Sequence, residues 1–313
     1  MPQYLTSLTL RLAAGAQQID AATRETHAQW IVSQQCDGGG FAGREGPPDP
    51  YYTAFALRSL WILGGLDERV AIPTGAFLRD RLTRKDSIVD LVSLVFAAAI
   101  LELAAGEVVI DDGDDRWRNN VASLLASLRC DDGGFAKTPE GRAGSTYQTF
   151  LSVLCHELIG IDVPQPDAII DFLQSQKQDG GGYREIRAAK RAGVNPTAAA
   201  IGTFVTLNRL QKSAEADTID FLAEMQTSDG GLTANTRIPF ADLLSSCTGA
   251  ITLRDLDAMD CIDVARLNRY AQSMQVRDDG GRVSGGFVGF ELDQTADVEY
   301  TFYGLSTLSI VQQ

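Results

Sequence analysis

The residues Cys36-Asp37-Gly38-Gly39-Gly40-Phe41-Ala42-Gly43-Arg44 begin the segment that decides the fold. This glycine-rich turn is followed by a loop and then by an apolar run at 51–63. The phrase returns four times, as Cys130-Asp131-Asp132-Gly133-Gly134-Phe135, Gln178-Asp179-Gly180-Gly181-Gly182-Tyr183, Ser228-Asp229-Gly230-Gly231-Leu232 and Asp278-Asp279-Gly280-Gly281. Each copy precedes another apolar run, so the sequence predicts repeats of one structural unit.

The spacing of the copies predicts six units. The aspartates directly before the glycine pairs lie at 37, 132, 179, 229 and 279, at intervals of 95, 47, 50 and 50 residues. Because the first interval is about twice the others, we expect a degenerate copy near residue 85. Arg84-Lys85-Asp86 stands there without glycine, before the apolar run 87–105.

The pattern within a unit is helical on both sides of the turn. From Trp117 to Leu128 apolar residues recur at intervals of three and four, as on one face of an amphipathic helix. After the loop, runs such as 196–207 are apolar on nearly every side, and we expect these helices to be buried all round. No segment shows a strand pattern. We predict an all-α fold of six helical-hairpin repeats closed into an α/α toroid, with residues 1–313 forming a single domain.

Composition excludes several classes of protein. The 41 acidic and 27 basic residues give a net charge of -14, which repels nucleic acid and anionic membrane surfaces unless a local basic patch overrides it. No apolar run is long enough to span a bilayer, and no cleavable signal is recognisable. Five cysteines are an odd number, and Cys36 and Cys130 occupy the same place in two repeats, so disulfides are not expected. We expect a cytoplasmic protein without a membrane span or a nucleic-acid partner.

One loop departs from the acidic balance. Between the glycine turn at 180–182 and the following helix stand Arg184, Arg187, Lys190 and Arg191, with Glu185 as the one acid. Such a loop lies near the N-terminal ends of inner helices, where backbone N–H groups attract anions, and arginine suits phosphate oxygens. We interpret these four cations as diphosphate-binding residues; the alternative is a solvated loop that aids solubility. The matching loops of the fifth and first units add Arg237 and Arg44.

Aromatic residues recur in the predicted inner helices. A ring of buried helices leaves a central funnel, and aromatic walls below a basic rim suit a long apolar chain with an anionic head, such as a prenyl diphosphate. Each residue alone is better explained as core, so the hypothesis rests on the combination. The candidates for the isoprenoid pocket are Tyr52, Phe55, Trp61, Phe96, Tyr147, Phe150, Phe204, Phe302 and Tyr303.

Three other patterns favour packing over chemistry. His27 has no ligand partner at metal spacing, and His156 cannot form a dyad with the adjacent Cys155, since neighbours on a helix point about 100° apart. The segment 112–115 contains the Asp-x-Asp-Asp acid motif of one class of terpene cyclases. Because it leads into an outer helix, Asp114 or Asp115 is better explained as a helix N-cap.

The sequence resembles the β subunits of protein prenyltransferases, most of all the Rab geranylgeranyltransferase type, and more distantly squalene and hopene cyclases. The glycine-rich phrase at 37–44, followed by Asp49 and Tyr52, resembles the repeat of that family, and residues 297–310 resemble its last inner helix. The similarity covers essentially the whole chain. It implies a six-fold toroid, transfer of an isoprenoid group, and a separate helical-repeat α subunit as a possible partner.

The resemblance also implies a zinc ion that activates an acceptor thiol. In the family an Asp, a Cys two residues later and a His on the last inner helix hold this ion; here these positions are Asp242, Leu244 and Tyr300. Leucine offers no lone pair and phenol is a poor zinc ligand, so Asp242 is the one family metal ligand that remains. We therefore do not expect a zinc site of ordinary affinity. Tyr300 is the candidate to replace the metal as a hydrogen-bond donor or an acid.

These observations leave several functions open. The first hypothesis is a prenyltransferase-like enzyme that binds geranylgeranyl or farnesyl diphosphate, with the cationic loops around the head group. Asp242 and Tyr300 are its candidate catalytic residues, which serve an acceptor such as a protein. The alternatives are an isoprenoid cyclase that uses the same funnel but lacks an acid motif on an inner helix, and a non-catalytic isoprenoid-binding or scaffold module. An acidic carbohydrate enzyme is a further class, although no pair of carboxylates is singled out.

Overall fold

The computed structural model describes residues 3–82, 88–110 and 115–313, and within these ranges the chain is mainly helical. The degenerate repeat motif at 84–86 and the acidic segment 111–114 lie outside the described residues. No helix of the described chain is long and apolar enough to cross a membrane. The helices are α1 (Tyr4–Ala16), α2 (Ala21–Ser33), α3 (Pro50–Leu63), α4 (Glu68–Arg81), α5 (Ile88–Ala105), α6 (Asp115–Ser127), α7 (Thr146–Ile159), α8 (Pro166–Gln176), α9 (Val194–Thr206), α10 (Ala216–Glu224), α11 (Leu243–Asp255), α12 (Val264–Ser273) and α13 (Val298–Ile310), with short 3-10 turns at Lys212–Ala214 and Met259–Cys261.

The helices form pairs, as the repeat predicts. Each pair has a leading helix and a trailing helix, which the glycine turn separates in every pair except α4/α5. The pairs are α2/α3, α4/α5, α6/α7, α8/α9, α10/α11 and α12/α13. The trailing helices are the more buried of the two. In α13 every residue is buried except Glu299 and Tyr300.

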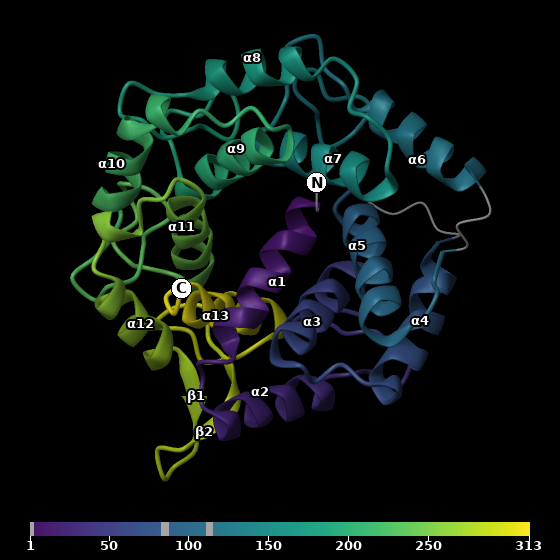
Figure 1. The fold of residues 1–313 in the computed structure, drawn as a ribbon, viewed down its shortest axis with the longest axis vertical. Coiled ribbons are helices and arrows are strands. Elements are labelled where there is room, and N and C mark those ends of the chain that lie inside the picture. Colours follow the sequence, from purple (N-terminus) through teal and green to yellow (C-terminus); the bar gives the residue numbers. More distant parts are fainter. Residues whose placement is uncertain (1–2, 83–87, 111–114) are drawn as a thin grey trace. The chain divides into compact units, whose positions relative to one another are not determined.

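The chain divides into two compact units. Unit 1 contains Met1–Tyr4 and Asp112–Val264, and unit 2 contains Leu5–Asp111 and Ala265–Gln313. In unit 1 the trailing helix α9 packs between α7 and α11 (Figure 1). In unit 2 the trailing helix α3 packs between α5 and α13 (Figure 1), so this unit joins the first repeats to the last one.

The glycine turn fixes how consecutive repeats pack. Gly39 and Gly181 have φ values of +86° and +87°, a conformation that favours glycine. A Cβ atom at Gly39 would lie 2.1 Å from the carbonyl oxygen of Pro73 in α4, and one at Gly181 would lie 1.9 Å from that of Asp217 in α10. The glycine therefore allows the turn to touch the backbone of the next leading helix.

A hydroxyl of the trailing helix holds the residue that follows each turn. The buried Phe41 donates its backbone N–H to Thr53 Oγ1 at 3.0 Å, and Tyr183 donates to Thr197 Oγ1 at 2.9 Å. The same bond joins Phe135 to Thr149, Leu232 to Ser246 and Phe287 to Thr301. The turn and the start of the trailing helix are thus one rigid corner.

Two details differ from the sequence predictions. β1 (Gln275–Arg277) and β2 (Val283–Phe287) form an antiparallel hairpin around the last glycine turn, so the expectation of no strands was wrong at this place. Gly285 and Gly286 have positive φ angles, and a Cβ atom at either would lie within 3 Å of Trp30 in α2, so glycine allows β2 to pack against that helix. Proline in a helix favours the first turn, but Pro73 lies inside α4, because Asp67 caps the helix earlier in the chain.

Candidate active site

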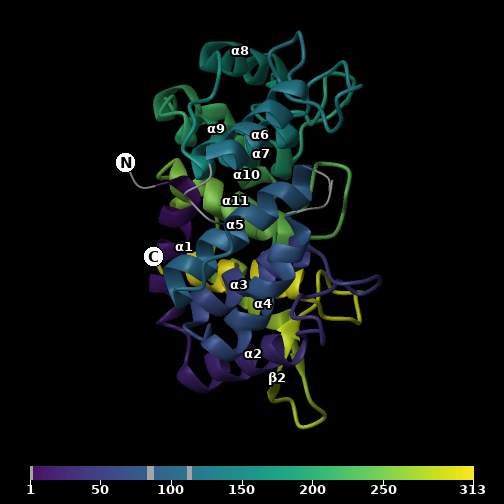
Figure 2. The same ribbon diagram turned by 90° about the vertical axis from the view of Figure 1, so that its right-hand side faces the viewer.

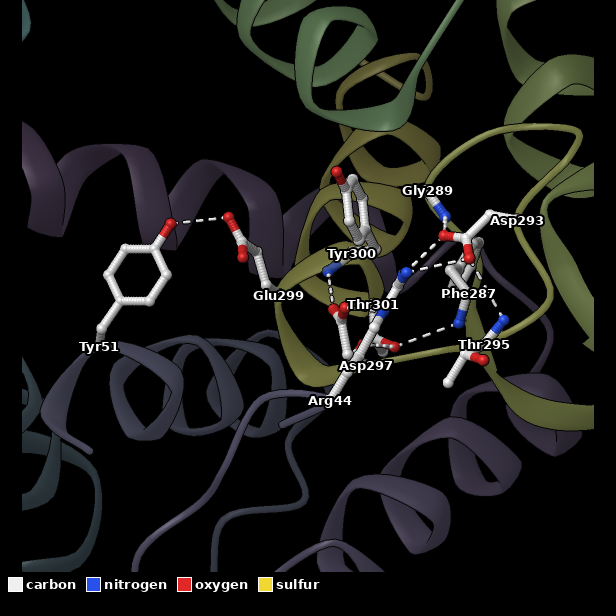
Figure 3. Close-up of polar contacts among 10 residues, drawn as sticks. All are labelled: Arg44, Tyr51, Phe287, Gly289, Asp293, Thr295, Asp297, Glu299, Tyr300 and Thr301. Atoms are coloured by element: carbon white, nitrogen blue, oxygen red, sulfur yellow. Dashed lines mark hydrogen bonds and ion pairs between the residues drawn. The ribbon is translucent and has the colours of Figure 1, made fainter. Parts of the chain in front are cut away.

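The first turn of α13 carries the candidate site of unit 2. Asp297 caps this helix: its carboxylate accepts the backbone N–H of Tyr300 at 2.7 Å. Asp and the helix N-terminus stabilise one another, since the free N–H groups and the helix dipole favour a negative charge. The cap fixes the direction of Glu299, the second residue after it (Figure 3).

Glu299 is a partly buried carboxyl group held by two phenols. Its Oε1 accepts a hydrogen bond from Tyr51 Oη at 2.7 Å (Figure 3) and a longer one from Tyr303 Oη at 3.5 Å. Burial raises the pKa of Glu299 above its ordinary value, the neighbouring charge of Asp297 adds to this, and the two tyrosines oppose it. The group therefore keeps its proton to a higher pH than an ordinary glutamate, as a general acid requires.

Predicted pocket aromatics pack against Tyr51 and Tyr303, the two hydrogen-bond donors of this carboxyl group. The ring of Phe55 lies 4.9 Å from that of Tyr51, 5.3 Å from that of Tyr303 and 5.4 Å from that of Phe302, measured between centroids. Phe55 comes from α3 and the other two predicted residues from α13. The structure thus brings Phe55, Phe302 and Tyr303 together next to Glu299.

Arg58 links Phe96 to the same cluster. Its guanidinium carbon lies 3.8 Å from the ring centroid of Phe302, 5.3 Å from that of Phe96 and 5.7 Å from that of Phe55. Cations are attracted to the faces of aromatic rings, so three rings around one guanidinium make a favourable arrangement. Sequence reasoning missed Arg58, although it is the one charged residue in α3 and follows Phe55 by three positions.

Arg44 is held by two acids of unit 2. Its Nε donates to Asp297 at 2.7 Å, and its terminal nitrogens donate to Asp293 at 2.9 and 2.6 Å (Figure 3). Burial opposes ionisation of Asp293, but the bonds from Arg44 and from the N–H groups of Gly289 and Thr295 outweigh it and lower its pKa. Arg44 thus fastens the loop after the first turn to the loop before α13.

Two of the three predicted tyrosines of unit 2, Tyr52 and Tyr300, are fixed by close packing. The ring of Tyr52 lies under Gly43, where a Cβ atom would approach it to 2.4 Å, and the ring of Tyr300 lies under Gly289 in the same way, at 2.7 Å. Arg44 lies over the Tyr300 ring, 5.3 Å from its centroid. Tyr300 is therefore positioned by Gly289, by Arg44 and by the helix cap.

Asp242, the retained family metal ligand, has the role of an N-cap in unit 1. Its carboxylate accepts the backbone N–H of Ser245 at 2.7 Å and the hydroxyl of Ser245 at 2.9 Å, while burial raises its pKa. Leu244 offers no donor, and within the described chain no three His, Cys, Asp or Glu side chains are grouped to hold a metal ion. The residues around Asp242 do not fit the zinc ion that the family resemblance implies.

The predicted diphosphate-binding residues lie on two loops of unit 1. Arg184 is partly buried and donates to the carbonyl oxygens of Arg187 and Ser175. The side chains of Arg187, Lys190, Arg191 and Arg237 are exposed. Val194 donates its backbone N–H to the carbonyl oxygen of Ala234 at 2.9 Å. This hydrogen bond joins the loop that carries Arg187, Lys190 and Arg191 to the loop that carries Arg237.

Two of the remaining pocket candidates of unit 1, Phe150 and Phe204, have ring contacts with other residues. Phe204 packs against Tyr183 with the centroids 6.1 Å apart, and Phe150 packs against Tyr4 at 6.2 Å. Tyr147, at the start of α7, is 37% exposed. Phe150 and Phe204 thus have packing partners other than one another.

Both histidines serve packing. His27 is fully buried, stacks on Phe287 with the centroids 4.8 Å apart, and accepts the Gly286 N–H at Nδ1. His156 is buried in the last turn of α7, and desolvation lowers the pKa of its imidazole. Both would be neutral near pH 7, as expected of core histidines.

Comparison with known proteins shows the family. The model of the prenyltransferase alpha-alpha toroid domain matches residues 4–162 and 149–312, which together cover nearly the whole chain. This chain belongs to that family. The predicted all-α fold class is thereby confirmed. A separate comparison with curated proteins finds no match.

Solved structures share the fold at low sequence identity. The type II terpene cyclase MstE from Scytonema, in a variant bound to geranylgeranyl dihydroxybenzoate, is 11% identical with a TM-score of 0.62, over 98% of both chains. A protein from Actinoplanes is 14% identical with a TM-score of 0.60, over 94% of this chain and 98% of the other. Protein geranylgeranyltransferase-I from Candida albicans, complexed with GGPP, is 13% identical with a TM-score of 0.54, over 96% and 83%.

Proposed function

We propose that this protein is an isoprenoid-binding enzyme of the toroid family that acts by proton transfer from Glu299. The observation that carries this proposal is the partly buried carboxyl group on α13, hydrogen-bonded by Tyr51 and bordered by the aromatic cluster of Phe55, Phe302 and Tyr303. The site supplies an acid with a raised pKa beside apolar walls. Those are the two requirements for protonating a carbon–carbon double bond away from water.

The reaction class is an acid-initiated cyclisation. The O–H of protonated Glu299 gives its proton to one carbon of a double bond, whose electron pair forms the new C–H bond. The carbocation left on the other carbon is attacked by the next double bond, which closes a ring. Loss of a proton from a neighbouring carbon to a base then restores a double bond, so the product is an isomer of the substrate and no co-reactant is needed.

Two other observations support this choice. Aromatic faces stabilise positive charge, and the rings of Phe55, Phe96 and Phe302 already do so for the guanidinium of Arg58. Among the structural relatives, the terpene cyclase binds a geranylgeranyl compound and the geranylgeranyltransferase binds GGPP. An isoprenoid diphosphate, geranylgeranyl or farnesyl, is therefore the substrate class to try first.

The second candidate is prenyl transfer, as in the Rab-type subunits that the sequence resembles. It is favoured by the exposed cations of unit 1, Arg187, Lys190, Arg191 and Arg237, which suit a diphosphate. For this candidate, the acceptor and the α-type subunit are separate proteins. The weakness is activation of the acceptor thiol, because the residues around Asp242 do not fit a zinc ion.

Incubation in heavy water distinguishes the candidates. The protein is incubated with geranylgeranyl or farnesyl diphosphate in ²H₂O, and the extracted products are analysed by mass spectrometry. Cyclisation gives an isomer that carries one non-exchangeable deuterium, and Glu299→Gln abolishes it while the exposed Glu291→Gln does not. Transfer instead releases diphosphate without deuterium uptake into the isoprenoid. Unchanged substrate in spite of calorimetric binding would favour a non-catalytic binding module.

A further inference from the structure

Three loops of unit 1 form a continuous edge, which we call the basic rim: residues 137–145, 184–193 and 233–241. Thr146 donates its N–H to the carbonyl of Glu185 at 2.8 Å and its hydroxyl to that of Arg184 at 2.6 Å. The bond from Val194 to Ala234 joins the second loop to the third. In Figure 2 the loops of this unit project on one side, beyond the ends of α7, α9 and α11.

The charge of the basic rim is opposite to that of the chain. Its two acids are Glu140 and Glu185, and Glu185 accepts a hydrogen bond from the Ser145 hydroxyl. The basic rim contains seven cations, and the side chains of all but Arg184 are exposed. The six exposed cations make no ion pair within the part of the chain that the structure describes. The cations are Lys137, Arg142, Arg184, Arg187, Lys190, Arg191 and Arg237.

Exposed apolar side chains stand among these cations. Ile186, Ile238 and Phe240 are 42%, 43% and 53% exposed. Ile186 is followed directly by Arg187, and Ile238 follows Arg237. Apolar groups that insert between headgroups, next to cations that meet lipid phosphates, are typical of proteins that bind membrane surfaces.

The rest of the surface would oppose binding in other orientations. The net charge of -14 repels an anionic bilayer wherever the basic rim does not face it. The corresponding loop of unit 2 shows the contrast: Phe290 and Leu292 are also exposed, but Glu291 and Asp293 flank them. The combination of apolar and cationic side chains therefore belongs to the loops of unit 1.

We propose that the basic rim docks unit 1 on the surface of an anionic lipid bilayer. Ile186, Ile238 and Phe240 enter the headgroup layer, and the cations pair with lipid phosphates. The alternation of apolar and cationic residues favours a bilayer over an acidic protein, because the headgroup layer offers both apolar contact and phosphate within a few ångströms. The proposal stands on these loops and does not depend on the chemistry at Glu299.

Vesicle co-sedimentation of the full chain tests the charges. Wild-type protein is expected to bind vesicles that contain phosphatidylcholine and phosphatidylglycerol, and to bind them more weakly as the salt concentration rises. It is not expected to bind vesicles of phosphatidylcholine alone. The triple variant Arg187→Gln, Lys190→Gln, Arg191→Gln is expected to bind about 100-fold more weakly, from about a fivefold loss per cation. A control with the same change in net charge uses exposed arginines elsewhere and is expected to bind like wild type: Arg69→Gln, Arg209→Gln and Arg282→Gln.

A second pair of variants tests the apolar residues. Ile238→Ser with Phe240→Ser is expected to weaken vesicle binding at least tenfold, whereas Phe290→Ser with Leu292→Ser leaves it unchanged. Thermal melts confirm that each variant is folded. Absence of wild-type binding to the anionic vesicles, or equal losses in the rim and control variants, would overturn the proposal. In the first case an acidic protein becomes the partner that the basic rim suits.

Discussion

The loops after the glycine turns differ between the two units, although the turns themselves are alike. In unit 1 they carry the exposed cations of the basic rim. In unit 2 the loops at 42–49 and 288–297 contain one cation, Arg44, which is bound by Asp293 and Asp297. A cation in unit 2 thus holds the structure together, whereas those exposed in unit 1 are available to a ligand or a surface.

The trailing helices of the two units also differ, in the residue two positions after the N-cap. This second residue after the N-cap differs from repeat to repeat. In the five repeats with a described cap it is Tyr51, Tyr147, Asn195, Leu244 and Glu299. A carboxyl group occurs here in unit 2 alone, and Tyr51, at the equivalent position of the first repeat, is its hydrogen-bond donor. The shared corner carries the fold, and this position carries the residue to which we assign the chemistry.

The shared corner gives the largest expected effect. Gly39→Ala in unit 2 and Gly181→Ala in unit 1 each place a Cβ atom against a backbone carbonyl in a positive-φ turn, so each should destabilise the protein by about 3 kcal/mol or more. Gly38→Ala and Gly180→Ala meet nothing within 4 Å and are the matched controls. Chemical denaturation measures both pairs; a large loss in one unit alone would show that the two corners are not equivalent.

The loop cations give the next effect. Arg44→Ala leaves Asp293 and Asp297 without their cation and is expected to cost about 2–3 kcal/mol of unfolding free energy. Arg237→Ala, in the matching loop of unit 1, should change it by less than about 0.5 kcal/mol because the side chain is exposed. Equal losses for the two variants, measured in urea, would remove the distinction between structural and available cations.

Much of this architecture could be predicted from the sequence. The glycine pairs recur at a nearly constant interval, and the apolar periodicity gives the helices, so the repeats, their turns and the fold class follow from local patterns. The packing of His27 and His156 follows from the lack of partners nearby in sequence.

The candidate site could not be predicted in the same way. Tyr51 and Glu299 are 248 residues apart, and they meet because α3 packs against α13. Nothing local to Glu299 marks it as an acid, and its raised pKa comes from the burial that this packing creates. Asp242 attracted attention through the family resemblance, but in the structure it repeats the capping role of Asp49 and Asp297.

The smallest expected effect is the contribution of Glu299 to the pH dependence of protein stability. The pKa of Glu299 is raised in the folded protein above its value of about 4.5 in the unfolded chain. The stability that this group contributes is therefore fully present at a pH below the unfolded-state pKa, and it is lost as the pH rises through the folded-state pKa. Glu299→Gln should therefore raise the melting temperature at pH 8, by about 2 °C, and leave it nearly unchanged at pH 4. Glu291→Gln is the control, and a lower melting temperature for Glu299→Gln at pH 8 would count against the raised pKa.

The pH dependence of product formation tests proton transfer from Glu299 most directly. The charged and titratable groups that interact with this carboxyl are Tyr51, Tyr52, Tyr303, Asp297 and Arg44. The account predicts that wild-type kcat falls as the pH rises through the raised pKa of Glu299, and that Glu299→Gln is at least about 100-fold slower at every pH. A Glu299→Gln enzyme with the wild-type rate and the wild-type pH profile would contradict it.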